Sequence, residues 1–152
     1  MQIIQGNIWK AKLPVMIVIP AHSQISMSGD LVIGAGILLD VSQKLPSFPT
    51  MCGGMIKRIG YDYGFQEIQH PRTPGRAGLG LFRTRTKWQE DGSVFLIELA
   101  CQFLKEYAMH NKDIPIRLAY PGIGIGLLQR DLVDPVLIKN LGQLDNVDVY
   151  YA

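Results

Sequence analysis

The sequence of 152 residues has little cysteine, little charge and no long apolar run. Its two cysteines, Cys52 and Cys101, form neither a disulfide framework nor the spacing of a metal site, which favours a reducing, cytoplasmic location and predicts no metal. Charged residues make up 18% of the chain and the formal net charge is +2, which is too small to indicate nucleic acid as a specific partner. The longest apolar stretch, residues 13–21, is too short to span a bilayer, so no membrane partner is expected.

Apolar residues make up 47% of the chain and fall into short runs that alternate between strand and helix patterns. Strands are predicted for residues 1–5, 15–19, 65–70, 81–88, 116–120 and 147–151. Helices are predicted for residues 37–45, 94–110 and 131–141, with a weaker helix around Pro49. Alternating strands and helices predict a single α/β domain over residues 1–152, built as a three-layer α/β/α sandwich.

A glycine-rich loop joins a strand pattern to a helix pattern in residues 117–131, RLAYPGIGIGLLQRD. Pro121 ends the strand, and Gly122, Gly124 and Gly126 alternate with isoleucines before the helix. Glycine lets the backbone approach a ligand closely, and unpaired amides at a helix N-terminus point toward negative charge. A single loop of this kind is better explained as a tight turn, because motif matches produce false positives.

A second loop of the same kind makes an anion-binding role more credible than a tight turn alone. In residues 31–46, LVIGAGILLDVSQKLP, Gly34 and Gly36 flank Ala35 directly before a helical pattern that ends at Pro46. This loop also follows an apolar strand, residues 15–19, across a polar segment. Ligands of α/β sheets bind outside the carboxyl ends of the strands. The two loops are therefore predicted to converge on one diphosphate.

Five short segments, in this order, resemble macro domains, the ADP-ribose-binding modules: QGNIW, VIPAH, IGAGI, PGIGIG and VDVYY. The resemblance covers nearly the whole chain. Within the family, the chain is most similar to the divergent branch of terminal ADP-ribose protein glycohydrolases and its phage-borne relatives. The pairs Ala21-His22 and Thr86-Lys87 and the segment from Gly34 to Ile37 carry that similarity.

The resemblance implies a mixed, mostly parallel sheet of about six strands with ADP-ribose held between the two glycine loops. The residues that it places at the ligand are Asn7, Ile8, Ala21, Gly34, Ala35, Gly36, Ile37, Pro121, Gly122, Ile123, Gly124, Ile125, Gly126, Leu127 and Tyr150. The expected partner is ADP-ribose or an ADP-ribosylated protein, and no cofactor is expected.

Two residues are candidates for catalysis. The resemblance places Lys87 near the distal ribose, where its amine could attack the anomeric carbon. The alternating pattern alone instead puts Lys87 with Arg83 and Arg85 on a solvated basic strand face. His22 either bonds a ribose hydroxyl or acts as a general base, or it is a polar loop residue. Asn7 likewise either accepts a hydrogen bond from an adenine amino group or caps a turn.

The chain departs from the family pattern at three positions. Asn7 replaces an adenine-binding Asp, and His22 stands where many members have Asn. Leu128 replaces the Asp that follows the second loop in the glycohydrolase branch, which leaves Asp131 as the nearest carboxylate. Three interpretations stay open: an ADP-ribose binder with or without hydrolysis of ADP-ribose from protein carboxylates, a hydrolase of ADP-ribose esters or phosphates, and a macro-like interaction module that has lost its ligand.

Overall fold

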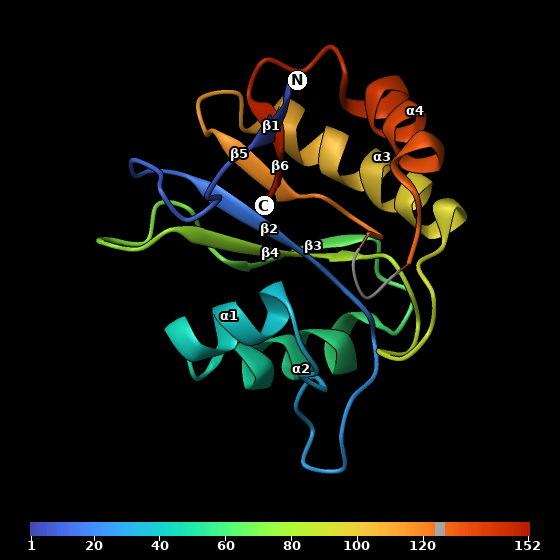
Figure 1. Cartoon of the computed structure of the whole chain (residues 1–152). Coiled ribbons are helices and arrows are strands. Elements are labelled where there is room, and N and C mark those ends of the chain that lie inside the picture. Colours follow the sequence, from blue (N-terminus) through green and yellow to red (C-terminus); the bar gives the residue numbers. More distant parts are fainter. Residues whose placement is uncertain (124–126) are drawn as a thin grey trace.

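The computed structural model describes residues 1–123 and 127–152, in which strands and helices alternate along the chain (Figure 1). The strands are β1 (Ile3–Gln5), β2 (Met16–Ala21), β3 (Phe65–Gln69), β4 (Gly78–Arg83), β5 (Ile116–Ala119) and β6 (Val147–Tyr151). The helices are α1 (Ile37–Lys44), α2 (Phe48–Ile59), α3 (Val94–His110) and α4 (Arg130–Leu141). None of these helices, in the described part of the chain, has both the length and the apolar character needed to cross a membrane.

The six strands form one sheet in the order β1-β6-β5-β2-β4-β3. All neighbouring strands pair in parallel except β3, which is antiparallel to β4. The predicted mixed, mostly parallel sheet is therefore confirmed. Because the parallel strands share one direction, the segments that follow β1, β2, β4, β5 and β6 meet at the same edge of the sheet, called here the carboxyl edge.

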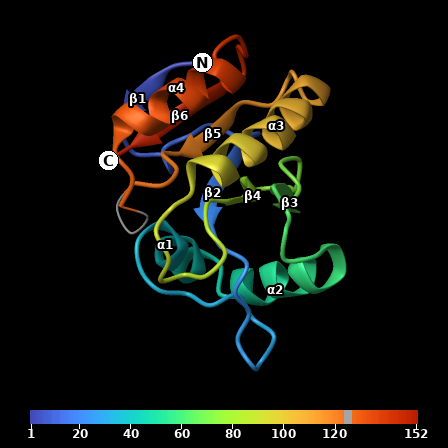
Figure 2. The same cartoon turned by 90° about the vertical axis from the view of Figure 1, so that its right-hand side faces the viewer.

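Two helices cover each face of the sheet, which gives the predicted three layers (Figures 1 and 2). Residues of α3 and α4 form one apolar core with Met16 and Val18 of β2. Residues of α1 and α2 form the other core, with Ile17 and Ile19. Successive side chains of a strand point to opposite faces, so β2 is buried on both sides. This burial explains the continuous apolar run at this position of the sequence.

The sequence prediction differs most from the structure at β4. The strand predicted for residues 81–88 begins three residues earlier and ends at Arg83. The solvated basic face is wrong for Arg83 and Arg85, whose side chains are buried. Arg83 Nη1 donates to the carbonyl of Tyr61 at 3.1 Å, and Arg85 Nε donates to the carbonyl of Trp88 at 3.1 Å. Backbone carbonyls therefore bind guanidinium groups that an alternating sequence pattern assigns to solvent, and only Arg83 Nε is buried without a hydrogen-bond partner among the described residues.

The weaker helix around Pro49 is confirmed as α2, in spite of its two adjacent glycines. A Cβ atom placed on Gly53 would lie 1.9 Å from the carbonyl oxygen of Gly29. Glycine at this position thus allows the segment after β2 to pack directly on the helix backbone. The loss of helix propensity at Gly53 has a packing reason.

Candidate functional site

A cleft of about 710 Å³ lies at the carboxyl edge, beside the ends of β1, β5 and β6 and the start of α1. Figure 2 shows the end of β6 and helix α1 on the same side of the molecule. The residues that line the cleft are Gln5, Gly6, Asn7, Ile8, Trp9, Gly36, Ile37, Asp40, Ala119, Tyr120, Ile123, Tyr150, Tyr151 and Ala152. Both predicted glycine loops contribute to this lining, and they therefore border a single site.

Aromatic side chains line part of the cleft, called here its aromatic end: Trp9, Tyr120, Tyr150 and Tyr151. Arg117 places its guanidinium carbon 4.5 Å from the ring centroid of Tyr150, and its Nη1 donates to the carbonyl of Lys10 at 2.8 Å. Arg130 lies 4.7 Å from the ring of Tyr151, and its Nη2 donates to Asp134 Oδ2 at 3.2 Å. Each tyrosine ring is held in place because it packs against an arginine that is itself fixed by a hydrogen bond. Fixed aromatic faces are suited to a flat nucleobase.

Asn7 is exposed at this aromatic end, in the turn after β1. Its Oδ1 accepts a hydrogen bond from the backbone N–H of Trp9 at 2.9 Å, so the predicted turn-capping role is present. This bond fixes which side of the amide is the oxygen, because only the oxygen can accept from an N–H. Asn7 therefore offers its amino group, a donor, for further contacts.

The two glycine loops line the cleft through Gly36, Ile37 and Ile123, and this part is called here the glycine end. Gly36 has φ 70° and ψ −146° and occupies the N-cap position of α1. This conformation is almost restricted to glycine. The backbone N–H groups of the first turn of a helix lack partners within the helix, so they are available to an anion. In the second loop, Gly122 has φ 84° and its carbonyl accepts from the N–H of Leu128 at 2.8 Å. One carboxylate, Asp40, also lines this end.

The predicted ligand-binding residues divide into three groups. Those that line the cleft are Asn7, Ile8, Gly36, Ile37, Ile123 and Tyr150. Those that do not line it, but belong to the two loops or to the end of β2, are Ala21, Gly34, Ala35, Pro121, Gly122 and Leu127. Gly124, Ile125 and Gly126 lie outside the described residues, so their predicted role is not addressed.

His22 is fully buried directly after β2. Its Nδ1 accepts from the N–H of Gln24 at 3.0 Å, and its Nε2 lies 2.9 Å from the carbonyl oxygen of Val32. The proton must therefore sit on Nε2, which donates to Val32. Burial lowers the pKa of His22 to about 4, with a smaller contribution from the charge of Arg85. Both ring nitrogens are engaged by backbone, so this geometry favours a structural role, and participation in catalysis stays a prediction.

Lys87 lies in the connection between β4 and α3. Glu90 Oε2 accepts from the backbone N–H groups of Thr86 and Lys87, each at 3.2 Å, and this holds the turn. The carbonyl of Thr86 accepts from the N–H of Ser23 at 3.1 Å, which ties the turn to the end of β2. The Lys87 side chain is exposed and is not among the cleft-lining residues. Its predicted catalytic role also stays a prediction.

The sequence prediction did not include eight of the residues that line the cleft: Gln5, Gly6, Trp9, Asp40, Ala119, Tyr120, Tyr151 and Ala152. Trp9 belongs to the turn that includes Asn7, and Tyr120 directly precedes Pro121 at the end of a strand. The sequence could have indicated these two aromatic residues, because Trp9 follows a predicted strand and Tyr120 is the last residue of another. Asp40 had no such signal, because a carboxylate in the first turn of a helix is normally explained by the helix dipole.

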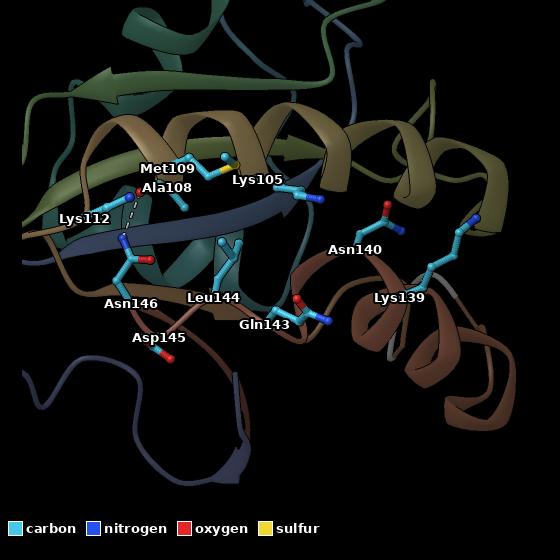
Figure 3. A pocket seen from close by; sticks show the side chains of 10 residues that line it. All are labelled: Lys105, Ala108, Met109, Lys112, Lys139, Asn140, Gln143, Leu144, Asp145 and Asn146. Atoms are coloured by element: carbon cyan, nitrogen blue, oxygen red, sulfur yellow. Dashed lines mark hydrogen bonds between the residues drawn. The ribbon is translucent and has the colours of Figure 1, made fainter.

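A second hollow, of about 580 Å³, lies at the amino ends of β5 and β6, between the C-terminal ends of α3 and α4 (Figure 3). Lys105, Lys112 and Lys139 surround it, and Asn146 closes one side by donating to the carbonyl of Ala108 at 3.1 Å. Lys139 is paired with Glu98 at 2.9 Å. Among the described residues that line this hollow there is no glycine and no aromatic ring, so it lacks the features of the cleft.

No protein-family model and no curated protein matches the sequence. Solved structures do match it. Thermosipho africanus DarTG in complex with ADP-ribose superposes with a TM-score of 0.80 at 15% identity over 98% of this chain. The chain spans 41% of the length of that protein. The macrodomain of Thermus aquaticus DarG gives a TM-score of 0.77 at 20% identity, with 98% of this chain and 95% of that chain covered.

The macrodomain of Mycobacterium tuberculosis DarG gives a TM-score of 0.74 at 19% identity, with 97% of this chain and 94% of that chain covered. At these identities the likeness concerns the fold. It agrees with the six-stranded mixed sheet and its three layers. The chain therefore has the macrodomain fold.

Proposed function

We propose that the cleft binds ADP-ribose or a related nucleoside diphosphate. The observation that carries this proposal is the composition of the cleft, which combines fixed aromatic rings with two glycine loops and a helix start. The nucleobase lies against Tyr150 and Trp9, and the diphosphate lies at Gly36 and Ile37. The DarTG structure with a similar fold, which holds ADP-ribose, supports the choice of ligand.

Calorimetric titration with ADP-ribose, ADP and AMP tests the proposal. We expect micromolar binding of the diphosphates and weaker binding of AMP, because AMP places only one phosphate at the helix N-terminus. Circular dichroism verifies that the protein is folded. An absence of heat at millimolar ADP-ribose and ADP with folded protein would contradict the proposal and would favour an interaction module without a nucleotide.

Hydrolysis is a further part of this proposal, with ADP-ribosylated protein as the partner. The amine of Lys87 attacks the anomeric carbon of the distal ribose, and the modified carboxylate leaves and takes up the proton that the nitrogen loses; water then releases ADP-ribose and restores the amine. Because Leu128 occupies the position of a carboxylate, we expect turnover to be slow, by on the order of a hundred-fold or more.

The release of ADP-ribose from a modified protein is measured for the wild type and for Lys87→Ala, with the exposed Lys12→Ala as the matched control. Loss of release in Lys87→Ala alone supports the lysine mechanism. Equal release by the wild type and Lys87→Ala contradicts that mechanism. Binding without release by the wild type shows a protein that recognises ADP-ribose without removing it.

A further inference from the structure

The carboxyl edge is open over one part of the sheet and sealed over the next. The cleft occupies the edge over β6 and β5, where Tyr150 and Ala119 lie. Next along the edge are β2 and β4, and the segments that follow these two strands are joined by hydrogen bonds. The N–H of Thr84 donates to the carbonyl of Ala21 at 2.8 Å, and the N–H of Ser23 donates to the carbonyl of Thr86 at 3.1 Å.

Trp88 covers the first glycine loop in this sealed part. A Cβ atom placed on Gly34 would lie 2.7 Å from Cε3 and 2.9 Å from Cζ3 of the indole ring, so the ring lies directly on the glycine backbone. The N–H of Trp88 donates to Gln24 Oε1 at 3.2 Å, and its carbonyl accepts from Arg85 Nε at 3.1 Å. These bonds hold the backbone of Trp88 in the position that places its ring on Gly34.

The same connection also contacts the second glycine loop. A Cβ atom placed on Gly92 would lie 3.2 Å from Cα of Gly122 and 3.0 Å from Cδ1 of Leu128. The segment from residue 84 to residue 93 therefore contacts Gly34 at one point and the Gly122 region at another. It closes the edge beyond the glycine end of the cleft.

A ligand with its base at Tyr150 and its diphosphate at Gly36 can extend along the first glycine loop toward Gly34. Gly34 precedes Gly36 by two residues, on the side of β2 and β4, and its surface is occupied by the indole. A nucleoside diphosphate ends before this point. A second ribose that continues along the loop from Gly36 toward Gly34 meets the indole of Trp88.

We propose that Trp88 determines whether this site admits a group beyond the diphosphate. A nucleoside diphosphate binds with the indole in place, whereas ADP-ribose binds only when the indole leaves Gly34. The site as built therefore prefers ADP to ADP-ribose. This inference rests on the proposed function, because it requires that nucleoside diphosphates bind in the cleft.

Calorimetric titration of the wild type and Trp88→Ala with ADP and ADP-ribose tests the inference. In the wild type we expect ADP-ribose to bind about tenfold more weakly than ADP. The indole must leave Gly34 before ADP-ribose can bind, and the loss of this apolar contact costs free energy. In Trp88→Ala this difference should shrink at least fivefold, with little change for ADP. Trp9→Phe, at the aromatic end, should change both affinities by the same factor.

Tryptophan fluorescence gives a second measurement that does not depend on the folding of Trp88→Ala. The chain has two tryptophans, so Trp9→Phe leaves Trp88 as the sole reporter. We expect ADP-ribose to change its emission and ADP to leave it unchanged. Two results overturn the role of Trp88. In the first, Trp88→Ala leaves the ratio of the ADP and ADP-ribose affinities unchanged. In the second, Trp88→Ala weakens the binding of ADP-ribose alone. Failure of both ligands to bind the wild type overturns the proposed function itself.

Discussion

The open and sealed parts of the carboxyl edge are built from different kinds of contact. In the open part, side chains such as Asn7 and Tyr150 border the cleft and leave faces available to a ligand. In the sealed part, several polar groups are buried and paired: Tyr63 Oη donates to the carbonyl of His22 at 2.8 Å, and Arg85 Nε donates to the carbonyl of Trp88. A buried polar group without a partner destabilises a fold, so such a region tolerates little change. Substitutions in the open part should affect binding, and those in the sealed part should affect stability.

The largest expected effect is on binding, from Gly36→Asp in the open part. The substitution places a carboxylate where the diphosphate is proposed to lie and forces a φ of 70° on a non-glycine residue. We expect calorimetry to show at least a hundred-fold loss of affinity for ADP and ADP-ribose. Gly75→Asp is the matched control, because Gly75 has a φ of 71° and no atom within 4 Å of a Cβ placed on it. Equal loss in both variants would mean that backbone strain, and not the location of Gly36, explains the effect.

The second effect is on stability, from protonation of His22 in the sealed part. Burial lowers its pKa to about 4 in the folded protein, against about 6.5 in an unfolded chain. Below pH 6.5 the unfolded chain therefore binds a proton that the folded protein does not bind until about pH 4. The contribution of neutral His22 to the free energy of unfolding is complete above pH 6.5. It is lost as the pH falls to about 4, and the loss is on the order of 3 kcal/mol.

Urea denaturation at several pH values measures this effect. In His22→Gln the free energy of unfolding should fall less between pH 7 and pH 4 than in the wild type. His110→Gln, which changes an exposed histidine, should retain the wild-type slope. The same slope in all three proteins would show that His22 is not protonated differently in the folded and unfolded states.

Much of the fold was predictable because each element has a local signature. The apolar run of β2 and the helical period of residues 94–110 indicated the elements that the structure contains. Strand β4 ends at Arg83, whose buried side chain donates to the carbonyl of Tyr61, a partner 22 residues away in the sequence. Contacts between distant segments leave no periodic signal, so the burial of Arg85 was equally hidden.

The backbone conformation of the site could be predicted from the sequence, but the environment of its side chains could be predicted only in part. Glycines before a helix indicated the loop at Gly36 because they report a local conformational need. The environment of His22 depends on Gln24 and Val32, and the cover on Gly34 comes from Trp88, which lies far along the chain. Which parts of one sheet edge are open is a property of packing between loops, and no short motif records it.

A smaller effect, on the choice of base, is expected from Asn7→Asp in the open part. The carboxylate can still accept from the N–H of Trp9, so the turn is kept, but the amino group of Asn7 is replaced by an acceptor. A carboxylate attracts the 6-amino group of adenine and repels the 6-oxo group of hypoxanthine. We expect the ratio of the dissociation constants of IDP and ADP to rise about tenfold. Gln5→Glu, which adds the same charge at the cleft, should leave that ratio unchanged, and an equal rise in both variants would exclude a specific contact by Asn7.

The smallest effect is expected from Asp40→Asn, and it is a gain. Asp40 lines the glycine end of the cleft from the first turn of α1, where its charge opposes a diphosphate at the same helix N-terminus. Asp40 is exposed, so solvent weakens this repulsion, and removal of the charge should tighten ADP binding only about threefold. The gain should disappear at about 0.5 M salt, because the Debye length is then only a few ångströms.

Asp145→Asn, at the hollow beside the amino ends of the strands, removes the same charge far from the cleft and should leave ADP binding unchanged. If Asp40→Asn instead weakens ADP at both salt concentrations, the carboxylate contacts the ligand as a hydrogen-bond acceptor, and the glycine end of the cleft holds a sugar hydroxyl instead of the diphosphate.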